Sequence, residues 1–570
     1  MPGCVWIVTV ATALVLICRA AHAQPGFPAA RQSQQLDLFR PAPRVLQQYL
    51  RRAEKAIAEQ DYRAAVELLG SILTGQTQDP DLAEVQQDYF MRGLADERHR
   101  TSIKARALQL LGQLPAEGRQ WYELKYGTEA AQLVRRAIAD RDISKLHEVT
   151  RKYFHTRAGY DAAVLLGRWQ LDQGHPLAAA LSLKRLYDVP HAAGDYEPTL
   201  SLLLAASWLQ AGMEQQAVDV IVALKQRTSA NGVSLGGRTV PWFTKNEDAR
   251  AWLEEHLQGA SIDLHEREQQ WVLYRGNPQR NGLTAGGFPL MHFRWRTATV
   301  IDPADAELVA ERRLMYESED RVVLPAFQPL AVGDIIVMRT PRWVFGVDLK
   351  TGKLVWNYPW FQETIGGVAD DTDEQAAFNA NRNKRRDELV QRLWEDAPYG
   401  QLASDGERVY LLDEMPYAAS GRVRPQLVFG PNLNRNQTSA PRGNQLVACS
   451  LAEEGKLHWI VGGETGEDEP RLAGAFFLGP PLPLMGQLFV LAEMAGEIRL
   501  VVLDAQTGRL QWFQQVAHVA EQTIDLDPNR RLAGATPSFD DGILVCPTSA
   551  GACVAVDLAT RSLLWGYQYP

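Results

Sequence analysis

Few residues in this sequence stand in a spacing that supports chemistry. Its 11 histidines form no His-Glu-x-x-His pair and none of its five cysteines stands in a Cys-x-x-Cys pair, so no zinc site is predicted. Asp525, Asp527 and Asn529 have the spacing that begins a calcium loop. However, Arg530 stands where that loop needs glycine, and Thr536 stands where it needs a bidentate glutamate. The sequence therefore predicts a simple turn there.

Two charged runs could bind ions. Residues 370–374 read Asp-Asp-Thr-Asp-Glu and could attract a hard cation, whereas the basic run 382–386 could attract an anion. Both runs stand in a helical pattern, in which acidic first turns and solvated basic faces are ordinary features. We therefore assign no catalytic, cofactor-binding or metal-binding residue from the sequence.

The role of the cysteines depends on export. Val5–Ile17 is almost unbroken apolar sequence, and an Ala-His-Ala cleavage pattern ends at Ala23, although no Lys or Arg precedes the run. This pattern predicts a signal peptide, residues 1–23, and a periplasmic or extracellular protein. The alternative, a lipoprotein acylated at Cys18, is disfavoured because the residue before that cysteine is not small.

Cleavage would leave Cys449, Cys546 and Cys553 in a compartment where disulfides persist. Cys546 and Cys553 flank a turn-rich stretch between two apolar runs. They either form a disulfide across a hairpin or remain two buried thiols. Residues 24–40 begin with a Pro- and Gln-rich stretch and predict a disordered lead-in.

Length and charge limit the class of protein. A chain of 570 residues is too long for one hydrophobic core, so several domains are expected. A net charge of −9 is small for this length and argues against a nucleic-acid partner. After the predicted signal peptide, no run is apolar enough for a transmembrane helix.

The elements of the N-terminal half are helical. Residues 41–227 carry apolar positions three and four apart, with turns at Asp61, Asp142, Gly174 and Gly212. The last three turns are 32 and 38 residues apart, a period that resembles the stacked helix pairs of tetratricopeptide repeats. The resemblance implies a concave surface for protein partners. The alternative is a helical domain that only packs on its neighbour. Residues 228–268 predict a linker, a glycine-containing loop followed by a short helix.

The C-terminal half repeats one segment, Asp-x-x-Thr-Gly-x-x-x-Trp. Its copies contain Asp348, Gly352 and Trp356; Gly455 and Trp459; Asp504, Gly508 and Trp512; and Asp557 and Trp565, with Arg561 in place of the glycine. Each copy follows two β-rich runs, so the unit is predicted to be a four-stranded sheet. Glycine supplies the positive φ of the hairpin turn, aspartate bonds the turn amides and tryptophan packs between sheets.

This repeat resembles that of pyrroloquinoline-quinone (PQQ)-like β-propellers, and Trp271–Gly282 resembles the segment that opens many of them. The resemblance covers residues 269–570. Combined with helical repeats and a signal peptide, it is similar to large exported proteins of planctomycete-type bacteria. The predicted fold class is a multidomain α + β chain, a helical repeat array followed by an incomplete propeller of about 4–5 blades.

The sequence departs from PQQ-like propellers in two ways. Insertions separate the first copies of the repeat: residues 361–395, with an amphipathic helix, and the loop-like 415–442. The resemblance also implies seven or eight blades, so we expect a fragment, a shortened product or a chain that pairs with another chain.

Two functions follow from this comparison. The first is a non-enzymatic interaction or scaffold protein of the cell envelope that needs no cofactor. The alternative is a dehydrogenase that uses PQQ and calcium. The resemblance implies that such an enzyme would carry an adjacent cysteine pair and a Glu/Asn/Asp metal set. No adjacent cysteines occur in the sequence.

Overall fold

The computed structural model describes residues 38–75, 87–91, 99–228, 231–257, 270–283, 292–359, 390–413, 443–519, 524 and 527–569, except positions 236, 322, 324 and 342. The predicted signal peptide and the insertion 415–442 lie outside these residues. So do residues 24–37 of the predicted lead-in and residues 361–389 of the other insertion. Leu38 and Phe39, at the end of the predicted lead-in, are buried.

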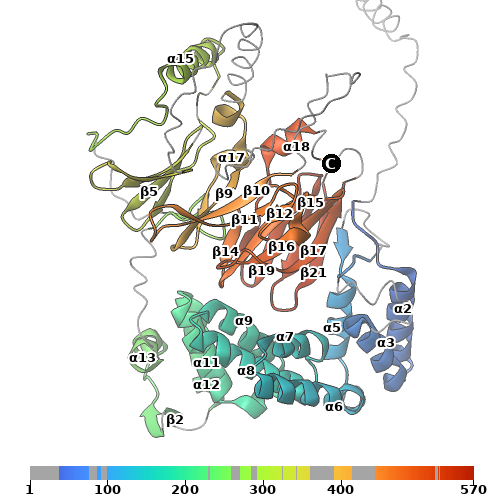
Figure 1. The fold of residues 1–570 in the computed structure, drawn as a ribbon. Helices are drawn as coiled ribbons and strands as arrows, with labels where there is room; N and C mark the ends of the chain where they lie inside the picture. The colour runs from blue at the N-terminus through green and yellow to red at the C-terminus, as the bar shows by residue number, and fades with distance from the viewer. Residues whose placement is uncertain are drawn as a thin grey trace, which may run out of the picture. The chain divides into compact units, whose positions relative to one another are not determined.

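The N-terminal half is helical, as predicted, and consecutive helices pack as antiparallel pairs (Figure 1). The helices are α2 (Arg44–Ala58), α3 (Tyr62–Thr74), α5 (Ile103–Gly112), α6 (Ala116–Asp140), α7 (Ile143–Lys152), α8 (Arg157–Asp172), α9 (Pro176–Tyr187), α10 (Pro190–Ala193), the 3-10 turn η1 (Gly194–Tyr196), α11 (Thr199–Gln210) and α12 (Glu214–Arg227).

Glycine allows close contacts between neighbouring helices. A side chain at Gly167 of α8 would lie 2.6 Å from Leu183 of α9, so glycine allows these two helices to approach. The predicted turn residues lie between helices. The Asp61 carboxylate accepts from the backbone N–H of Ala64 at the start of α3, and Gly174 has a φ of +75°.

Part of the expected linker loop is a hairpin. Strands β2 (Gly232–Leu235) and β3 (Arg238–Pro241) pair in antiparallel register, and η2 (Asn246–Asp248) and α13 (Ala249–Leu257) follow. The hairpin is held to the helices, because Lys225 Nζ donates to the Phe243 carbonyl over 2.7 Å and Trp252 Nε1 donates to the Pro241 carbonyl over 2.9 Å. The glycines indicated a loop. In the hairpin, however, Val233 is buried and Ser234 is exposed, which is the alternation of a strand.

The C-terminal half contains four antiparallel sheets among its described residues. Sheet A is β4 (Leu330–Val332), β5 (Ile335–Arg339), β6 (Val344–Asp348) and β7 (Leu354–Tyr358). Sheet B is β8 (Ala403–Ser404), β9 (Arg408–Asp413), β10 (Gln445–Ser450), β11 (Lys456–Gly462) and β12 (Gly466–Glu467). Sheet C is β13 (Phe476–Phe477), β14 (Leu482–Leu484), β15 (Gln487–Met494), β16 (Glu497–Asp504) and β17 (Leu510–His518). Sheet D is β18 (Ser538–Asp540), β19 (Ile543–Pro547), β20 (Ala552–Asp557) and β21 (Ser562–Gln568), with β1 (His99–Thr101) at its edge.

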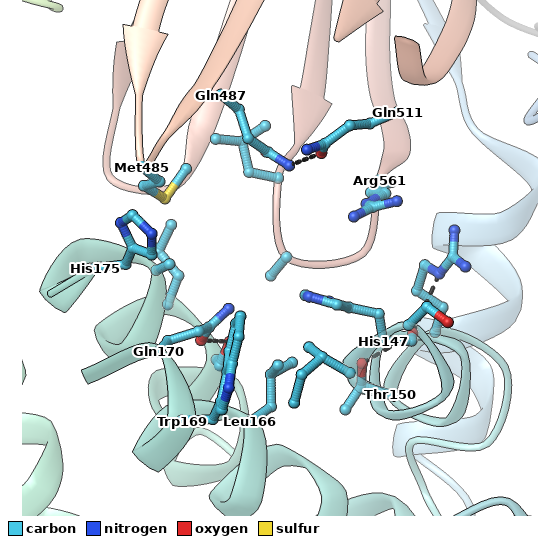
Figure 2. A pocket seen from close by; sticks show the side chains of 18 of the residues that line it. His147, Thr150, Leu166, Trp169, Gln170, His175, Met485, Gln487, Gln511 and Arg561 are labelled. Carbon is cyan, nitrogen blue, oxygen red and sulfur yellow. Dashed lines mark hydrogen bonds between the residues drawn. The ribbon is translucent and has the colours of Figure 1, made fainter. Parts of the chain in front are cut away.

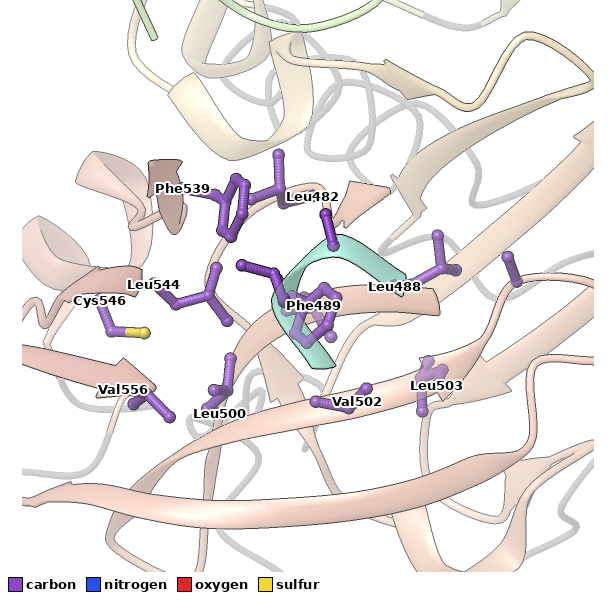
Figure 3. Packing of buried hydrophobic residues seen from close by; sticks show 14 of the residues in the cluster. Leu482, Leu488, Phe489, Leu500, Val502, Leu503, Phe539, Leu544, Cys546 and Val556 are labelled. Carbon is purple, nitrogen blue, oxygen red and sulfur yellow. The ribbon is translucent and has the colours of Figure 1, made fainter. Parts of the chain in front are cut away.

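The repeat predicts these sheets correctly in type and order. Each repeated turn leads into the strand that carries the tryptophan, as between β6 and β7 and between β16 and β17. The repeat did not predict the helices of this half: α15 (Pro303–Ser318) precedes sheet A, and the short helices α17 (Ala397–Gly400), η4 (Pro470–Leu472) and α18 (Pro528–Ala533) lie in the connections from one sheet to the next. The core between sheets C and D is made of aliphatic and aromatic side chains, including Phe489, Leu500 and Leu544 (Figure 3).

Residues of the N-terminal half complete the edge of sheet D. Strand β1 pairs with β21, with Thr101 opposite Trp565. The Phe39 and Phe90 rings lie over Gly566, where an added Cβ would be 2.9 Å from each ring. An unpaired edge strand exposes its amides and carbonyls, so β1 supplies the pairing that β21 would otherwise lack on this side.

Asp88 joins this edge to sheet C and is buried. Its carboxylate accepts from the Leu563 N–H over 2.8 Å and from the Ser102 hydroxyl over 2.5 Å. Its own backbone exchanges two hydrogen bonds with the Gln514 side chain, over 2.9 and 3.0 Å. Burial raises the pKa of Asp88, while its hydrogen bonds and Lys104 act in the opposite direction.

Candidate functional site

The repeat aspartates bond the turns that follow them. Asp348 Oδ1 accepts from the Thr351 N–H and hydroxyl, both over 2.6 Å. Asp504 accepts from the same two groups of Thr507, each over 2.8 Å. Hydrogen bonds from the turn lower the pKa of Asp348. These carboxylates therefore serve the hairpins.

The repeat tryptophans lie against the turn of the next sheet. A Cβ added at Gly455 would be 2.3 Å from the Trp356 ring, and one at Gly508 would be 2.8 Å from the Trp459 ring. Both glycines have φ near +70°, at +75° and +70° respectively. Glycine is required at both positions for two reasons: the backbone has a positive φ, and the indole ring lies too close for a Cβ.

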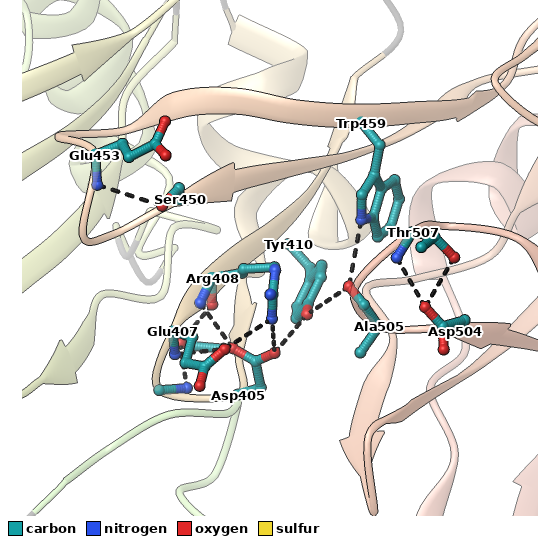
Figure 4. Close-up of polar contacts among 12 residues, drawn as sticks. Asp405, Glu407, Arg408, Tyr410, Ser450, Glu453, Trp459, Asp504, Ala505 and Thr507 are labelled. Carbon is teal, nitrogen blue, oxygen red and sulfur yellow. Dashed lines mark hydrogen bonds and ion pairs between the residues drawn. The ribbon is translucent and has the colours of Figure 1, made fainter.

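Figure 4 shows this contact between sheets B and C. Trp459 Nε1 donates to the Ala505 carbonyl over 3.2 Å, next to the turn of Asp504. The Tyr410 hydroxyl donates to Asp405 over 2.6 Å. Burial, followed by the charge of Asp405, raises the pKa of Tyr410, so this phenol stays neutral and serves as a donor.

The last repeat differs because Arg561 replaces glycine. Arg561 adopts the same left-handed backbone, with φ +56°, and its guanidinium lies 5.2 Å from the centre of the Trp512 ring. A cation over an aromatic face is attractive, so arginine preserves the contact in another form. It also places a positive charge at the turn of sheet D.

The opening segment runs along the first strands of the sheets. Trp271 exchanges backbone hydrogen bonds with Ala331 of β4, over 2.8 and 3.0 Å, and the Ser404 N–H of β8 donates to the Val272 carbonyl over 2.9 Å. Further along, the Phe539 N–H of β18 donates to the Pro278 carbonyl over 2.9 Å. One segment of the chain therefore covers the edges opposite the tryptophan strands of sheets A, B and D.

A cavity of about 570 Å³ lies where helices α7, α8 and α9 face the turns of sheets C and D. His147, Trp169 and Gln170 approach it from the helices, and Met485, Gln511 and Arg561 from the sheets (Figure 2). The two halves touch beside it, since a Cβ at Gly486 would be 3.1 Å from the His175 ring and one at Gly542 would be 2.9 Å from Leu181.

Positive side chains line this cavity. Arg151, Arg185 and Arg561 contribute guanidinium groups and His147 an imidazole. Burial lowers the pKa of Arg185 to about 10, while Asp557 acts in the opposite direction. Burial and the charge of Arg151 lower the pKa of Arg561 to about 9. Burial also lowers the pKa of Arg151. Arginine keeps its charge at neutral pH, so all three guanidinium groups are charged in a place that disfavours charge.

His147 has the opposite state. Burial, then the charges of Arg561 and Arg151, lower its pKa to about 4. The imidazole is neutral at pH 7, with one nitrogen that donates and one that accepts a hydrogen bond. The cavity therefore combines three arginines, one carboxylate from Asp504 and a neutral polar ring.

The three cysteines among the described residues are free thiols. Cys546 lies opposite Val554, and Cys553 lies opposite Pro547, so the two thiols are one register step apart. Neighbouring positions of a strand point to opposite faces of the sheet, which excludes the disulfide and leaves the alternative of two separate thiols. Burial raises the pKa of Cys449 and of Cys546.

Two sequence patterns that resemble functional motifs have structural roles: a calcium-like run and a Gly-x-Ser-x-Gly pattern. Asp527, from the calcium-like run, accepts from the Arg530 N–H over 3.1 Å and begins α18. Residues 232–236, Gly-Val-Ser-Leu-Gly, have the spacing of a serine nucleophile elbow. Ser234 lies opposite Thr239 in a hairpin and not at a strand-to-helix turn, so it is no elbow.

The described residues contain no group of three or more His, Cys, Asp or Glu side chains placed to hold a metal ion. Across the same part of the chain, no helix is both long and apolar enough to cross a bilayer. The cavity was not predicted from the sequence, because its lining residues come from two segments that are at least 300 positions apart. Arg561, as the one departure from the repeat glycine, was the signal that could have indicated it.

Residues 391–570 match the family model of the outer membrane protein assembly factor BamB. This part of the chain is a BamB-like domain of PQQ-type repeats. No curated protein matches the chain significantly.

Solved structures also resemble the chain. BamB from Moraxella catarrhalis is 17% identical, over 42% of this chain and 52% of that chain, with a TM-score of 0.22. A quinohemoprotein alcohol dehydrogenase from Comamonas testosteroni is 15% identical, over 56% of this chain and 44% of that chain, with a TM-score of 0.28. A europium-containing methanol dehydrogenase is 15% identical, over 54% of this chain and 50% of that chain, with a TM-score of 0.26. This chain thus spans about half the length of the BamB structure.

Proposed function

We propose that this chain is an exported, non-enzymatic interaction protein of the cell envelope. The observation that carries the proposal is the cavity that the helical half and sheets C and D build together. A single core cluster includes buried residues of both halves, such as Leu183 and Phe489, so the two halves present one joint surface. The match to a family named for outer membrane protein assembly and the apolar segment before Ala23 support the envelope location.

The contacts of the repeat residues support a role for this chain in protein–protein interaction. The aspartates bond their turns, and the tryptophans and glycines join one sheet to the next. These contacts give the repeat residues structural roles in the turns and between the sheets.

The described residues do not fit PQQ and calcium. The segment from Trp271 to Pro278 lies along the first strands of three sheets, where a propeller would otherwise open to a central ligand. The carboxylates of the repeats are held by their turns, and no adjacent cysteines occur. We therefore derive no redox step for this chain.

Site-specific photocrosslinking tests the proposal. The full chain, expressed in the organism that encodes it, would carry p-benzoylphenylalanine at Trp169, which is 37% exposed at the cavity, or at Ile138, which is 59% exposed on α6. We expect one discrete protein adduct from position 169 that is absent from position 138. Equal adducts from both positions, or none from position 169, would contradict an interaction surface at the cavity.

A titration tests the enzymatic alternative. Purified full-length chain would be mixed with PQQ and Ca²⁺, and both cofactor binding and dye-linked alcohol oxidation would be measured. We expect neither. Saturable PQQ binding accompanied by alcohol oxidation would overturn the proposed function.

A further inference from the structure

We propose that the cavity between α7–α9 and the turns of sheets C and D binds a peptide segment that presents a carboxylate beside an apolar side chain. This inference rests on the proposed function, since it names the partner chemistry of the same surface. Three observations support it: cations without ionic partners, an excess of arginines over carboxylates in the lining, and a mixed polar and apolar surface.

The three cavity arginines form no ion pair among the described residues. Arg151 Nε donates to the His147 carbonyl over 3.2 Å, and Arg185 Nη1 donates to the Thr150 carbonyl over 2.5 Å. Arg561 lies over the Trp512 ring. These contacts position the guanidinium groups and leave further N–H donors on each. Burying a positive charge without an anion costs desolvation free energy. A carboxylate that binds in the cavity would offset this cost.

The nearby carboxylates are occupied elsewhere. Asp504 lines the cavity but accepts from Thr507, and Asp557 accepts from the Ala559 N–H over 2.9 Å and from the Thr560 hydroxyl over 2.8 Å. Glu148 pairs with Lys152 over 2.7 Å. The cavity lining contains three arginines and one carboxylate, that of Asp504, so positive charge is in excess there. A carboxylate matches it best, because paired N–H donors of arginine fit the two oxygens.

The remaining lining favours a peptide over a free inorganic anion. Phe154, Leu181 and Phe489 provide apolar surface, which a small anion would not use. Gln170, Gln487 and Gln511 also line the cavity, and each amide carries both donors and acceptors, as a peptide backbone requires. The volume of about 570 Å³ is within the range of small-ligand sites, so it accommodates a short segment.

The carboxylate could belong to an acidic side chain or to a chain terminus, and three probes distinguish these sources. Leu-Phe-Glu-Leu with an amidated end and an uncharged nitrobenzoxadiazole label on its amino terminus carries one internal carboxylate. The same peptide with Gln in place of Glu carries none. The Gln peptide with a free end carries a terminal carboxylate. Binding to the purified full chain would be followed by fluorescence anisotropy.

We expect at least one carboxylate peptide to bind about tenfold more tightly than the neutral peptide. Arg561→Gly should weaken that binding about tenfold. This variant restores the glycine of the other repeats at a position with φ +56°, so folding should be retained. Arg185→Gln gives a second cavity variant, and Arg136→Gln on the exposed face of α6 is the matched control, with unchanged affinity.

Equal affinity for all three peptides, or unchanged binding by both cavity variants, would overturn the carboxylate site. Competition by inorganic phosphate at the same affinity as the peptide would overturn the peptide assignment. Failure of this inference is distinguishable from failure of the proposed function. A discrete adduct from position 169 without any carboxylate preference would keep the interaction surface and reject its chemistry.

Discussion

At the scale of single residues, the turn glycines meet two separate requirements. Gly455 has φ +75°, and its position faces the Trp356 ring at a distance that excludes a Cβ. Gly496, in the hairpin between β15 and β16, has a similar φ of +77° but nothing within 4 Å of an added Cβ. The two glycines therefore separate backbone strain from packing between sheets.

Gly455→Ala should lower the free energy of unfolding by about 3 kcal/mol, because left-handed strain of about 1–2 kcal/mol adds to a clash with the indole. Gly496→Ala should cost only about 1–2 kcal/mol, the strain alone. Urea unfolding followed by tryptophan fluorescence measures both. Equal losses in the two variants would show that the tryptophan contact adds nothing.

The cysteines give a second prediction at this scale. Cys546 and Cys553 point to opposite faces of sheet D, and Cys546 is fully buried whereas Cys553 is partly exposed. Under non-reducing conditions the folded protein should contain free thiols at Cys449, Cys546 and Cys553. Burial raises the pKa of all three thiols, but only Cys553 is partly exposed, so iodoacetamide labelling followed by peptide mass spectrometry should modify Cys553 first. A peptide pair joined through Cys546 and Cys553 would contradict the register.

At the scale of elements, strand β1 and the segment around Asp88 join the helical half to the sheets. The buried Asp88 carboxylate accepts from Leu563 of β21 and from Ser102 next to β1. Removing it leaves those donors buried without an acceptor. The sheets and the helices therefore depend on each other for stability at this edge.

Asp88→Ala should lower the free energy of unfolding by about 3 kcal/mol and speed hydrogen exchange at Leu563. Asp61→Ala is the control, because the Asp61 carboxylate also accepts from a backbone N–H but lies exposed within the helical half. That variant should cost about 1 kcal/mol and leave exchange in β21 unchanged. Fast exchange at Leu563 in both variants would remove Asp88 as the link between the halves.

At the scale of the whole molecule, buried histidines couple stability to pH. Burial, with the charges of Arg185 and His191, lowers the pKa of His155 to about 3, and His147 is lowered to about 4. An ordinary histidine titrates near 6.5. Above that pH both states are neutral and nothing is lost. Below it the unfolded chain takes up protons that the folded chain refuses, so stability falls as pH decreases.

Between pH 6.5 and 5, each of these histidines should reduce the free energy of unfolding by up to about 1.4 kcal/mol per pH unit. The variant His155→Phe cannot titrate and should lose less stability over this range than the wild type. Thermal unfolding at pH 7.5, 6.5, 5.5 and 5 measures the difference. Parallel curves for the two proteins would mean that His155 is protonated in the folded state.

Local patterns in the sequence determined the elements of this protein. Apolar spacing indicated the helices, and the repeat around Trp356, Trp459 and Trp512 indicated the sheets, because both depend on neighbouring residues. The hairpin at 232–241 was missed, since its glycines resemble those of a loop.

Only the tertiary structure decided what these elements do together. It pairs β1 with β21 across more than 450 positions, separates Cys546 from Cys553 by one register step, and brings Arg151, Arg185 and Arg561 to one cavity. No local pattern encodes such meetings, because they depend on how the helical half packs on the sheets. The candidate site therefore depends on the tertiary fold. In the repeat sequence, only the replacement of glycine by Arg561 indicates it.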